Sequence, residues 1–161
     1  MKIKFFAVGG TIDKVYFDAL SRYEVGDSNI NDILQNARVN FDYEIASLLK
    51  KDSLDMTEQD RLIVLKAVHD ELNDKIIITH GTDTMIETAE ALISIKDKVI
   101  VLTGAMEPAK FKTSDAVFNL GSAVAAVQVL PVGIYLAISG RIFTPDNVRK
   151  NRAKKQFEEK M

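Results

Sequence analysis

Residues 75–84 read KIIITHGTDT, and this stretch decides the fold. The run KIIIT at 75–79 is short, apolar and rich in β-branched residues, which is typical of a strand that is covered on both faces. The segment that follows, Thr84–Ile95, has the apolar period of a helix. The stretch therefore predicts a buried strand that leads through a loop of small and polar residues into a helix.

The same alternation extends over the rest of the chain. Short apolar runs predict further strands at Lys2–Val8, Phe41–Leu49, Val99–Thr103 and Leu130–Ile138. Longer amphipathic runs predict helices at Asn29–Asn36, Thr57–Leu72 and Asp115–Val127. Strands that alternate with helices indicate right-handed crossovers, so we expect a doubly wound α/β fold with a mainly parallel sheet in a flavodoxin-like strand order. A length of 161 residues predicts a single domain, 1–161.

One segment, Lys14–Gly26, fits neither the helical nor the strand period. We expect a long loop or a loose hairpin there. Long loops in compact domains are often lids over a site.

Composition excludes several classes of protein. The chain has no cysteine, which excludes disulfide scaffolds, thiol nucleophiles and Cys-ligated metals. Its 21 basic and 23 acidic residues leave no basic field for nucleic acid. We find no metal-ligand spacing and no phosphate-binding loop, so we expect no metal and no cofactor. The amino-terminal apolar run is too short for a signal sequence and no run is long enough for a membrane span, so we expect a cytoplasmic protein that does not bind membranes.

The loops that follow the predicted strands are the place to look for a site. Ligands of doubly wound sheets bind outside the carboxyl ends of the strands. The five loops there read GGTID (9–13), KKDSLDM (50–56), HGTDT (80–84), GAMEP (104–108) and SGRIF (139–143). Most of them carry small or hydroxyl residues, as the mouth of a binding crevice requires.

The loops GGTID and HGTDT each allow two interpretations. Two glycines let the backbone turn sharply and present Thr11 to a ligand, or Thr11 simply caps a helix. Thr84 with Glu87 fits a capping box, which predicts that Thr84 is a cap. Thr82 and Asp83 precede that cap and are free to hold a water or an amino group.

The other loops are ambiguous in the same way. Ser53 either places a hydroxyl in the crevice or starts the helix near Thr57. Ala105 lies in a tight backbone turn that suits a carbonyl accepting from a ligand amide. The carboxy-terminal run VRKNRAKKQFEEK (148–160) predicts a solvated helix face, from which Lys150 or Lys154 could reach the crevice as a proton acceptor.

Taken together, these fragments resemble the bacterial-type L-asparaginase family. The resemblance rests on GGTID, YEVG (23–26), DSLDM (52–56), HGTDTM (80–85), TGAMEP (103–108) and VRKN (148–151), which occur in the family's order and cover about residues 3–158. It implies an α/β fold like the family's amino-terminal domain. It also implies hydrolysis of the side-chain amide of asparagine, or sometimes glutamine, to the acid and ammonia.

The resemblance also implies roles for individual residues. Thr11 would be the nucleophile and Tyr23 its hydrogen-bond partner, while Thr82, Asp83 and Lys150 would form a second catalytic triad. The substrate-binding residues implied by the same motifs are Ser53 for the carboxylate, Asp83 for the amino group, Ala105 for the amide, and Gly81 beside them.

The sequence also departs from the family. Members are about twice this length, and their second domain contributes an acidic residue, often across a subunit interface. We expect this chain to act as one domain and to form a homo-oligomer. The helical stripe expected to pack in that oligomer comprises Ala116, Leu120, Ala123, Ala126 and Val127.

The leading hypothesis is therefore an amidohydrolase that acts on a small amide through an acyl-enzyme on Thr11. Two alternatives stay open: an amino-acid binding module without turnover, and an amidase subunit that delivers ammonia to a partner enzyme.

Overall fold

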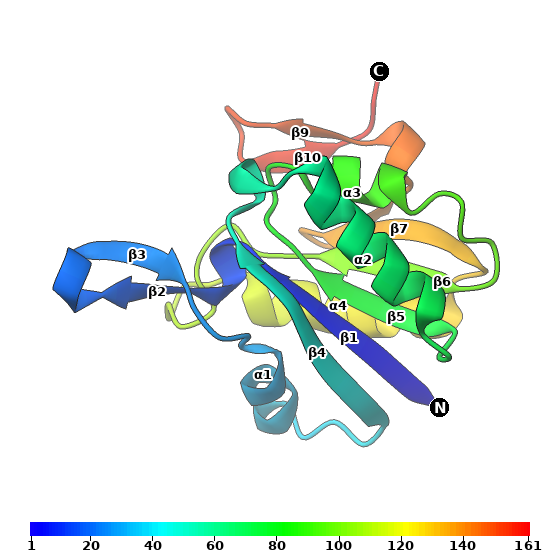
Figure 1. Cartoon of the computed structure of the whole chain (residues 1–161), viewed down its shortest axis with the longest axis horizontal. Coiled ribbons are helices and arrows are strands. Elements are labelled where there is room, and N and C mark those ends of the chain that lie inside the picture. Colours follow the sequence, from blue (N-terminus) through cyan, green and yellow to red (C-terminus); the bar gives the residue numbers. More distant parts are fainter.

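The computed structural model describes residues 1–161 and is built around a six-stranded sheet (Figure 1). Its strands are β1 (Lys2–Gly9), β4 (Asp42–Lys51), β5 (Lys75–Thr79), β6 (Val99–Thr103), β7 (Gly133–Ile138) and β8 (Arg141–Phe143). They lie side by side in the order β4-β1-β5-β6-β7-β8. All neighbours pair in parallel except β7 and β8, which pair antiparallel.

The predicted fold class and strand order are confirmed. The five strands expected from the sequence occupy the order 2-1-3-4-5, which is the flavodoxin-like arrangement, and β8 adds an antiparallel edge. The last predicted strand begins later than expected, at Gly133, because Pro131 lacks the N–H that a strand position within the sheet needs.

Helices cover both faces of the sheet, with α2 in front of it and α4 behind it in Figure 1. Their bounds are α1 Ile30–Asn36, α2 Glu58–Asp70, α3 Met85–Ala91 and α4 Ala116–Val129. One hydrophobic cluster joins α2 and α3 to one face, and a second cluster joins α1 and α4 to the other. None of the helices has both the length and the apolar character that crossing a bilayer requires.

The helical stripe that was expected to form an oligomer interface is buried in the core of the domain itself. All five of its residues are buried, and they belong to the cluster between α4 and the sheet. The apolar period of α4 is thus explained by packing within one chain. The use of this stripe for subunit contact was wrong.

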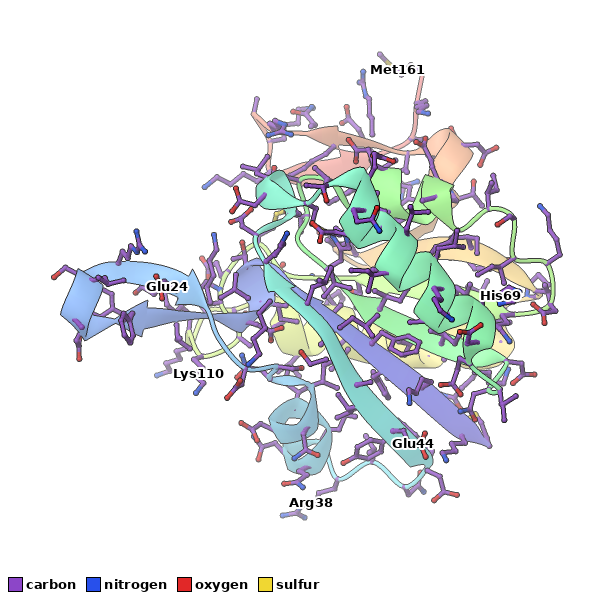
Figure 2. All side chains as sticks on the ribbon, in the orientation of Figure 1. Glu24, Arg38, Glu44, His69, Lys110 and Met161 are labelled. Carbon is purple, nitrogen blue, oxygen red and sulfur yellow. The ribbon has the colours of Figure 1, made fainter.

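The segment Lys14–Gly26 forms the hairpin that was one of the two expectations for it. Strands β2 (Lys14–Phe17) and β3 (Arg22–Val25) pair antiparallel, and a 3-10 turn at Asp18–Leu20 joins them. This hairpin projects from the body of the molecule, as the blue segment of Figure 1 shows. Figure 2, where Glu24 is labelled, shows its side chains extending away from the sheet.

The carboxy-terminal run is a hairpin and not the helix expected from its charges. Strands β9 (Arg149–Asn151) and β10 (Gln156–Glu158) pair antiparallel. Phe157 and Val148 are buried in the core cluster, so they anchor this hairpin to the domain. The basic residues had obscured a strand pattern in which only a few side chains are apolar. The two lysines 150 and 154 therefore do not share a helix face.

Candidate active site

Three loops meet at the carboxyl end of the sheet because glycines let their backbones touch. Gly10 has φ 90°, and a Cβ placed there would lie 2.4 Å from the backbone of Gly81. A Cβ on Gly81 would in turn lie 2.6 Å from the side chain of Ser53. Any larger residue at these two glycines would force the loops after β1, β4 and β5 apart.

The loop after β1 presents Thr11 to a small cavity. Thr11 begins a 3-10 turn, Thr11–Asp13, and is half-buried. The cavity has a volume of about 280 Å³. Its lining consists of Thr11, Thr82, Asp83, Met106, Lys150, Arg152 and Lys155. Four of the five residues expected to be catalytic thus face one space.

Lys150 connects two of these residues directly. Its Nζ donates to Thr82 Oγ1 at 2.8 Å and to Asp83 Oδ1 at 2.8 Å. The side chain of Lys150 is only 14% exposed, so water screens this ion pair weakly. The hydroxyl, the ammonium and the carboxylate form a continuous hydrogen-bonded chain along which a proton can move.

A second cation reaches the same carboxylate. Arg152 Nη1 lies 3.1 Å from Asp83 Oδ1, so Asp83 is paired with two positive groups. Thr82 Oγ1 itself donates to Met106 Sδ at 3.8 Å. This hydrogen bond is weak, because a thioether sulfur is a poor acceptor.

Comparisons with known proteins identify the family. The family model for the asparaginase amino-terminal domain matches residues 2–158. The chain belongs to the asparaginase family.

An L-asparaginase of Thermococcus kodakarensis is 33% identical over 162 residues, which cover 93% of this chain and 48% of that protein. The solved thermostable L-asparaginase from Thermococcus kodakarensis superposes with a TM-score of 0.85 at 29% identity, over 99% of this chain and 51% of that one. A probable cytoplasmic L-asparaginase from Campylobacter jejuni gives 0.80 at 30% identity, over 98% and 51% of the two chains. This asparaginase-family chain thus spans about half the length of the relatives it matches.

Ser53 of this asparaginase domain is a buried link between loops. It is 2% exposed, it lies outside the Thr11 cavity, and its Oγ accepts from the backbone N–H of Asp83 at 3.2 Å. Gly81 lies against it and is buried. Both residues therefore shape the loop that carries Asp83.

The capping box expected at Thr84 is absent. The side chain of Thr84 makes no cap hydrogen bond; its Oγ1 donates to the carbonyl of Ser53 at 2.7 Å. The close approach of the two loops offers this hydroxyl a buried acceptor, which competes with the amides of α3. A true capping box occurs at Thr57 and Asp60, where α2 begins.

Ala105 is buried beside the cavity in the loop after β6, and its neighbour Met106 lines the cavity. Asp115 holds this loop by accepting from the backbone N–H groups of Met106 and Glu107 at 3.0 and 3.1 Å. Asn119 ties it to the next strand end, because its amide donates to Gly104 O and its oxygen accepts from Ser139 N.

Tyr23 does not lie in the Thr11 cavity in this structure. It is 50% exposed on the projecting hairpin and packs between Tyr16 and Phe111, with ring centroids 5.5 and 5.7 Å apart. It lines a different surface cavity, together with Lys14 and Asp52. Figure 2 labels Lys110, the neighbour of Phe111, near the base of this hairpin.

Two buried titratable groups flank the site. Burial lowers the pKa of His80 to about 4, so its imidazole is neutral at pH 7. Its ring nitrogens bond Gly81 O at 2.7 Å and Thr88 Oγ1 at 2.8 Å, as a packing residue would. Burial raises the pKa of Asp13 to about 6, although Asn29 donates both its backbone N–H and its side-chain amide to Asp13 Oδ1.

Sequence reasoning missed Arg152, Asp13 and the pair formed by Asp115 and Asn119. Arg152 offered only its position in the same basic run as Lys150, because it lies in the turn after β9 and not on the strand. Asp13 and Asn119 offered no signal, because their bonds join segments that are distant in the chain.

Proposed function

We propose that this chain hydrolyses the side-chain amide of L-asparagine, or of a closely related amide, to the acid and ammonia. The observation that carries the proposal is the reach of Lys150 to both Thr82 and Asp83 in the cavity that Thr11 lines. The family supports the same chemistry, since the matched relatives are named L-asparaginases.

The proposed reaction has two steps. The Oγ1 of Thr11 adds to the amide carbon of the substrate, the carbon–nitrogen bond breaks, and the nitrogen leaves as ammonia after taking up a proton. The acyl group is then an ester on Thr11. Water adds to that ester, the acid is released, and the hydroxyl of Thr11 is restored.

The proposed role of Thr82, Lys150 and Asp83 is proton transfer. A threonine hydroxyl is a weak nucleophile at neutral pH and needs a base nearby. The bonded chain of these residues lines the same cavity as Thr11, which favours a relay from one hydroxyl to the other. Asp83 orients the ammonium of Lys150 within this relay.

Substrate contacts are proposed for the loops around the cavity. Asp83 would take the amino group of the substrate and the backbone of Ala105 the amide. Ser53 and Gly81, which the family motifs assign to the carboxylate, are buried outside the cavity, so they would contact it only after the loop at Ser53 shifts. Tyr23 would approach Thr11 when the hairpin of β2 and β3 moves over the cavity, because in its present position it lines another surface.

Ammonia release by the purified chain tests this function. We expect ammonia from asparagine, glutamine or a small peptide amide, at the same rate with and without EDTA, and none from the Thr11→Ala variant. Binding of asparagine without ammonia would favour the binding-module hypothesis. Release that appears only with a partner enzyme would favour the ammonia-delivery hypothesis. Loss of activity in EDTA would contradict a mechanism without a metal.

Assembly and location belong to the same proposal. We propose a homo-oligomer in the cytoplasm, and the solved relative from Campylobacter jejuni, a probable cytoplasmic L-asparaginase, supports that location. The stripe of α4 is buried within the domain and does not support the assembly. The oligomeric state must therefore be measured in solution. Sedimentation at micromolar concentration checks it, and a sedimenting mass of one chain would contradict it.

A further inference from the structure

The hairpin of β2 and β3 takes its direction from contacts at its base. No residue of its two strands is buried in the core clusters. Phe17 and Leu20 at its tip are exposed, and the hairpin projects from the domain (Figure 1). The buried contacts that can hold it therefore lie where it begins, beside Lys14, and where it ends, at Gly26.

Asp13 joins three segments at that base. It directly precedes β2 and is only 1% exposed. Its carbonyl accepts from the backbone N–H of Gly26 at 2.8 Å, which closes the hairpin. Its Oδ1 accepts from the backbone N–H and the side-chain amide of Asn29, at 2.9 and 3.3 Å. Asn29 is buried directly before α1, so one residue fastens both ends of the hairpin to the start of a core helix.

The same bonds hold the turn that carries the proposed nucleophile. Asp13 ends the 3-10 turn that Thr11 begins, and its N–H donates to Gly10 O at 3.1 Å. The side-chain amide of Asn29 also donates to Ile12 O at 3.3 Å. The orientation of Thr11 and the direction of the hairpin thus depend on one group of hydrogen bonds.

The surroundings of the Asp13 carboxyl leave this bonding as its role. Its side-chain hydrogen bonds come from Asn29, and no cation pairs with it. Removing a carboxyl from water without a counter-charge is unfavourable, and an apolar side chain in the same space would avoid that cost. An apolar side chain could not accept the two hydrogen bonds from Asn29, however. These bonds account for a carboxyl at this buried position.

We propose that Asp13 is a positioning residue, whose carboxyl holds the hairpin of β2 and β3 and the turn of Thr11 in a fixed relation through Asn29. Its effect on turnover rests on the amidohydrolase function proposed above, whereas its effect on the hairpin does not. A hairpin that moves over the cavity pivots at Asp13, so Tyr23 moves about a residue that stays fixed relative to Thr11. Misplacing a reacting group by about 1 Å can slow a reaction about 100-fold.

Limited proteolysis with trypsin tests the hairpin without an assay of turnover. Arg22 is exposed on β3, so cleavage after it reports how often the hairpin leaves its folded position. Asp13→Ala and Asn29→Ala should both raise the rate of this cleavage relative to cleavage in the exposed turn at Lys154. Asp18→Ala removes a carboxyl from the exposed turn of the same hairpin and should leave the ratio unchanged. The double variant of Asp13 and Asn29 should fall short of the product of the two single effects, because both residues act through the same bonds.

Turnover tests the position of Thr11. Well below the thermal midpoint of each variant, Asp13→Ala should lower kcat by roughly 10- to 100-fold, as expected for a displaced nucleophile. Asp13→Asn keeps the oxygen that accepts from Asn29 and should recover most of the native kcat. A role in stability alone would lower the midpoint of Asp13→Ala and leave its kcat native at that temperature.

The two measurements separate this inference from the proposed function. Native cleavage ratios in both Asp13→Ala and Asn29→Ala would overturn the fastening of the hairpin. Native kcat in Asp13→Ala, or an equal loss of kcat in Asp13→Asn, would overturn the positioning of Thr11. If no amide releases ammonia, the proposed function fails, and cleavage after Arg22 alone decides the role of Asp13. If Asp13→Ala does not fold, Asn29→Ala carries both measurements, because it leaves the backbone N–H donor to Asp13 in place.

Discussion

The Nζ of Lys150 lies 2.8 Å from the Oγ1 of Thr82, although 68 positions separate the two residues in the chain. Thr82 follows β5 in the middle of the sheet, whereas Lys150 lies on a separate short hairpin formed by β9 and β10. The hairpin reaches the site because Phe157, opposite Lys150, is buried in the core. An apolar anchor thus positions the cation that we propose to be catalytic.

Replacing Lys150 by methionine should reduce turnover by about 10²–10⁴-fold, the range for a lost general acid–base group. Methionine keeps the unbranched side chain and removes the donor to Thr82 and Asp83. The matched change Lys154→Met removes an equal charge from the exposed turn and should have little effect. Ammonia release by both variants is the measurement. Equal and small losses would mean that the basic run is only a solvated surface.

Replacing Thr11 by alanine should abolish ammonia release and leave the thermal midpoint close to native, because Thr11 is half-buried at the cavity. Thr84→Ala should lower the stability and leave ammonia release close to native. It removes the hydrogen bond to the Ser53 carbonyl, which should cost about 0.5–1.5 kcal/mol in the free energy of unfolding. If Thr84→Ala abolished turnover without a loss of stability while Thr11→Ala remained active, the nucleophile would lie in the loop of Thr84 and not in that of Thr11.

Much of the fold followed from local pattern. Runs such as KIIIT are apolar at nearly every position because both faces of the strand are covered, and that makes a central strand visible in the sequence. The carboxy-terminal hairpin was hidden, because its strands are only three residues each and mostly charged. Its stability comes from Val148 and Phe157 packing on a distant core, which no local period reports.

The sequence predicted the part of the candidate site that lies at the ends of the central strands, but not the part that depends on contacts between loops. Thr11, Thr82 and Asp83 follow central strands, so topology brings them to one edge of the sheet. Tyr23 lies on a hairpin that projects from the sheet, and no strand end determines where it points. The bond of Thr84 was hidden because it joins two loops whose contact depends on the close packing that Gly81 allows. The bond of Asp13 was hidden because it joins segments that are 16 residues apart.

The stability of the chain should depend on pH through Asp13. Burial raises the pKa of Asp13 to about 6 in the folded chain, above the 3.8 of an exposed carboxyl, so the folded state holds the proton more tightly. The contribution of this group is fully present below about pH 4 and is lost as the pH rises through 6. The loss should amount to roughly 1–3 kcal/mol.

The variant Asp13→Asn isolates this effect. Asparagine keeps the oxygen that accepts from Asn29 but cannot ionise. Urea unfolding between pH 4 and 7 should show the variant gaining stability relative to the native chain as the pH rises. Asp18→Asn, in the exposed turn of the neighbouring hairpin, is the control and should show no such gain. A constant difference between Asp13→Asn and the native chain would refute the prediction.

The hydroxyl of Tyr23 should matter for turnover even though it lies outside the Thr11 cavity here. Tyr23→Phe keeps the ring that packs on Tyr16 and Phe111, so stability should stay close to native while kcat falls. Tyr16→Phe alters the adjacent ring of the same cluster and should leave kcat unchanged, which makes it the matched control. Both variants need kcat and KM with the preferred amide, together with a thermal midpoint. A larger loss of kcat in Tyr16→Phe than in Tyr23→Phe, or native kcat in both, would show that this hairpin does not bring Tyr23 to the nucleophile.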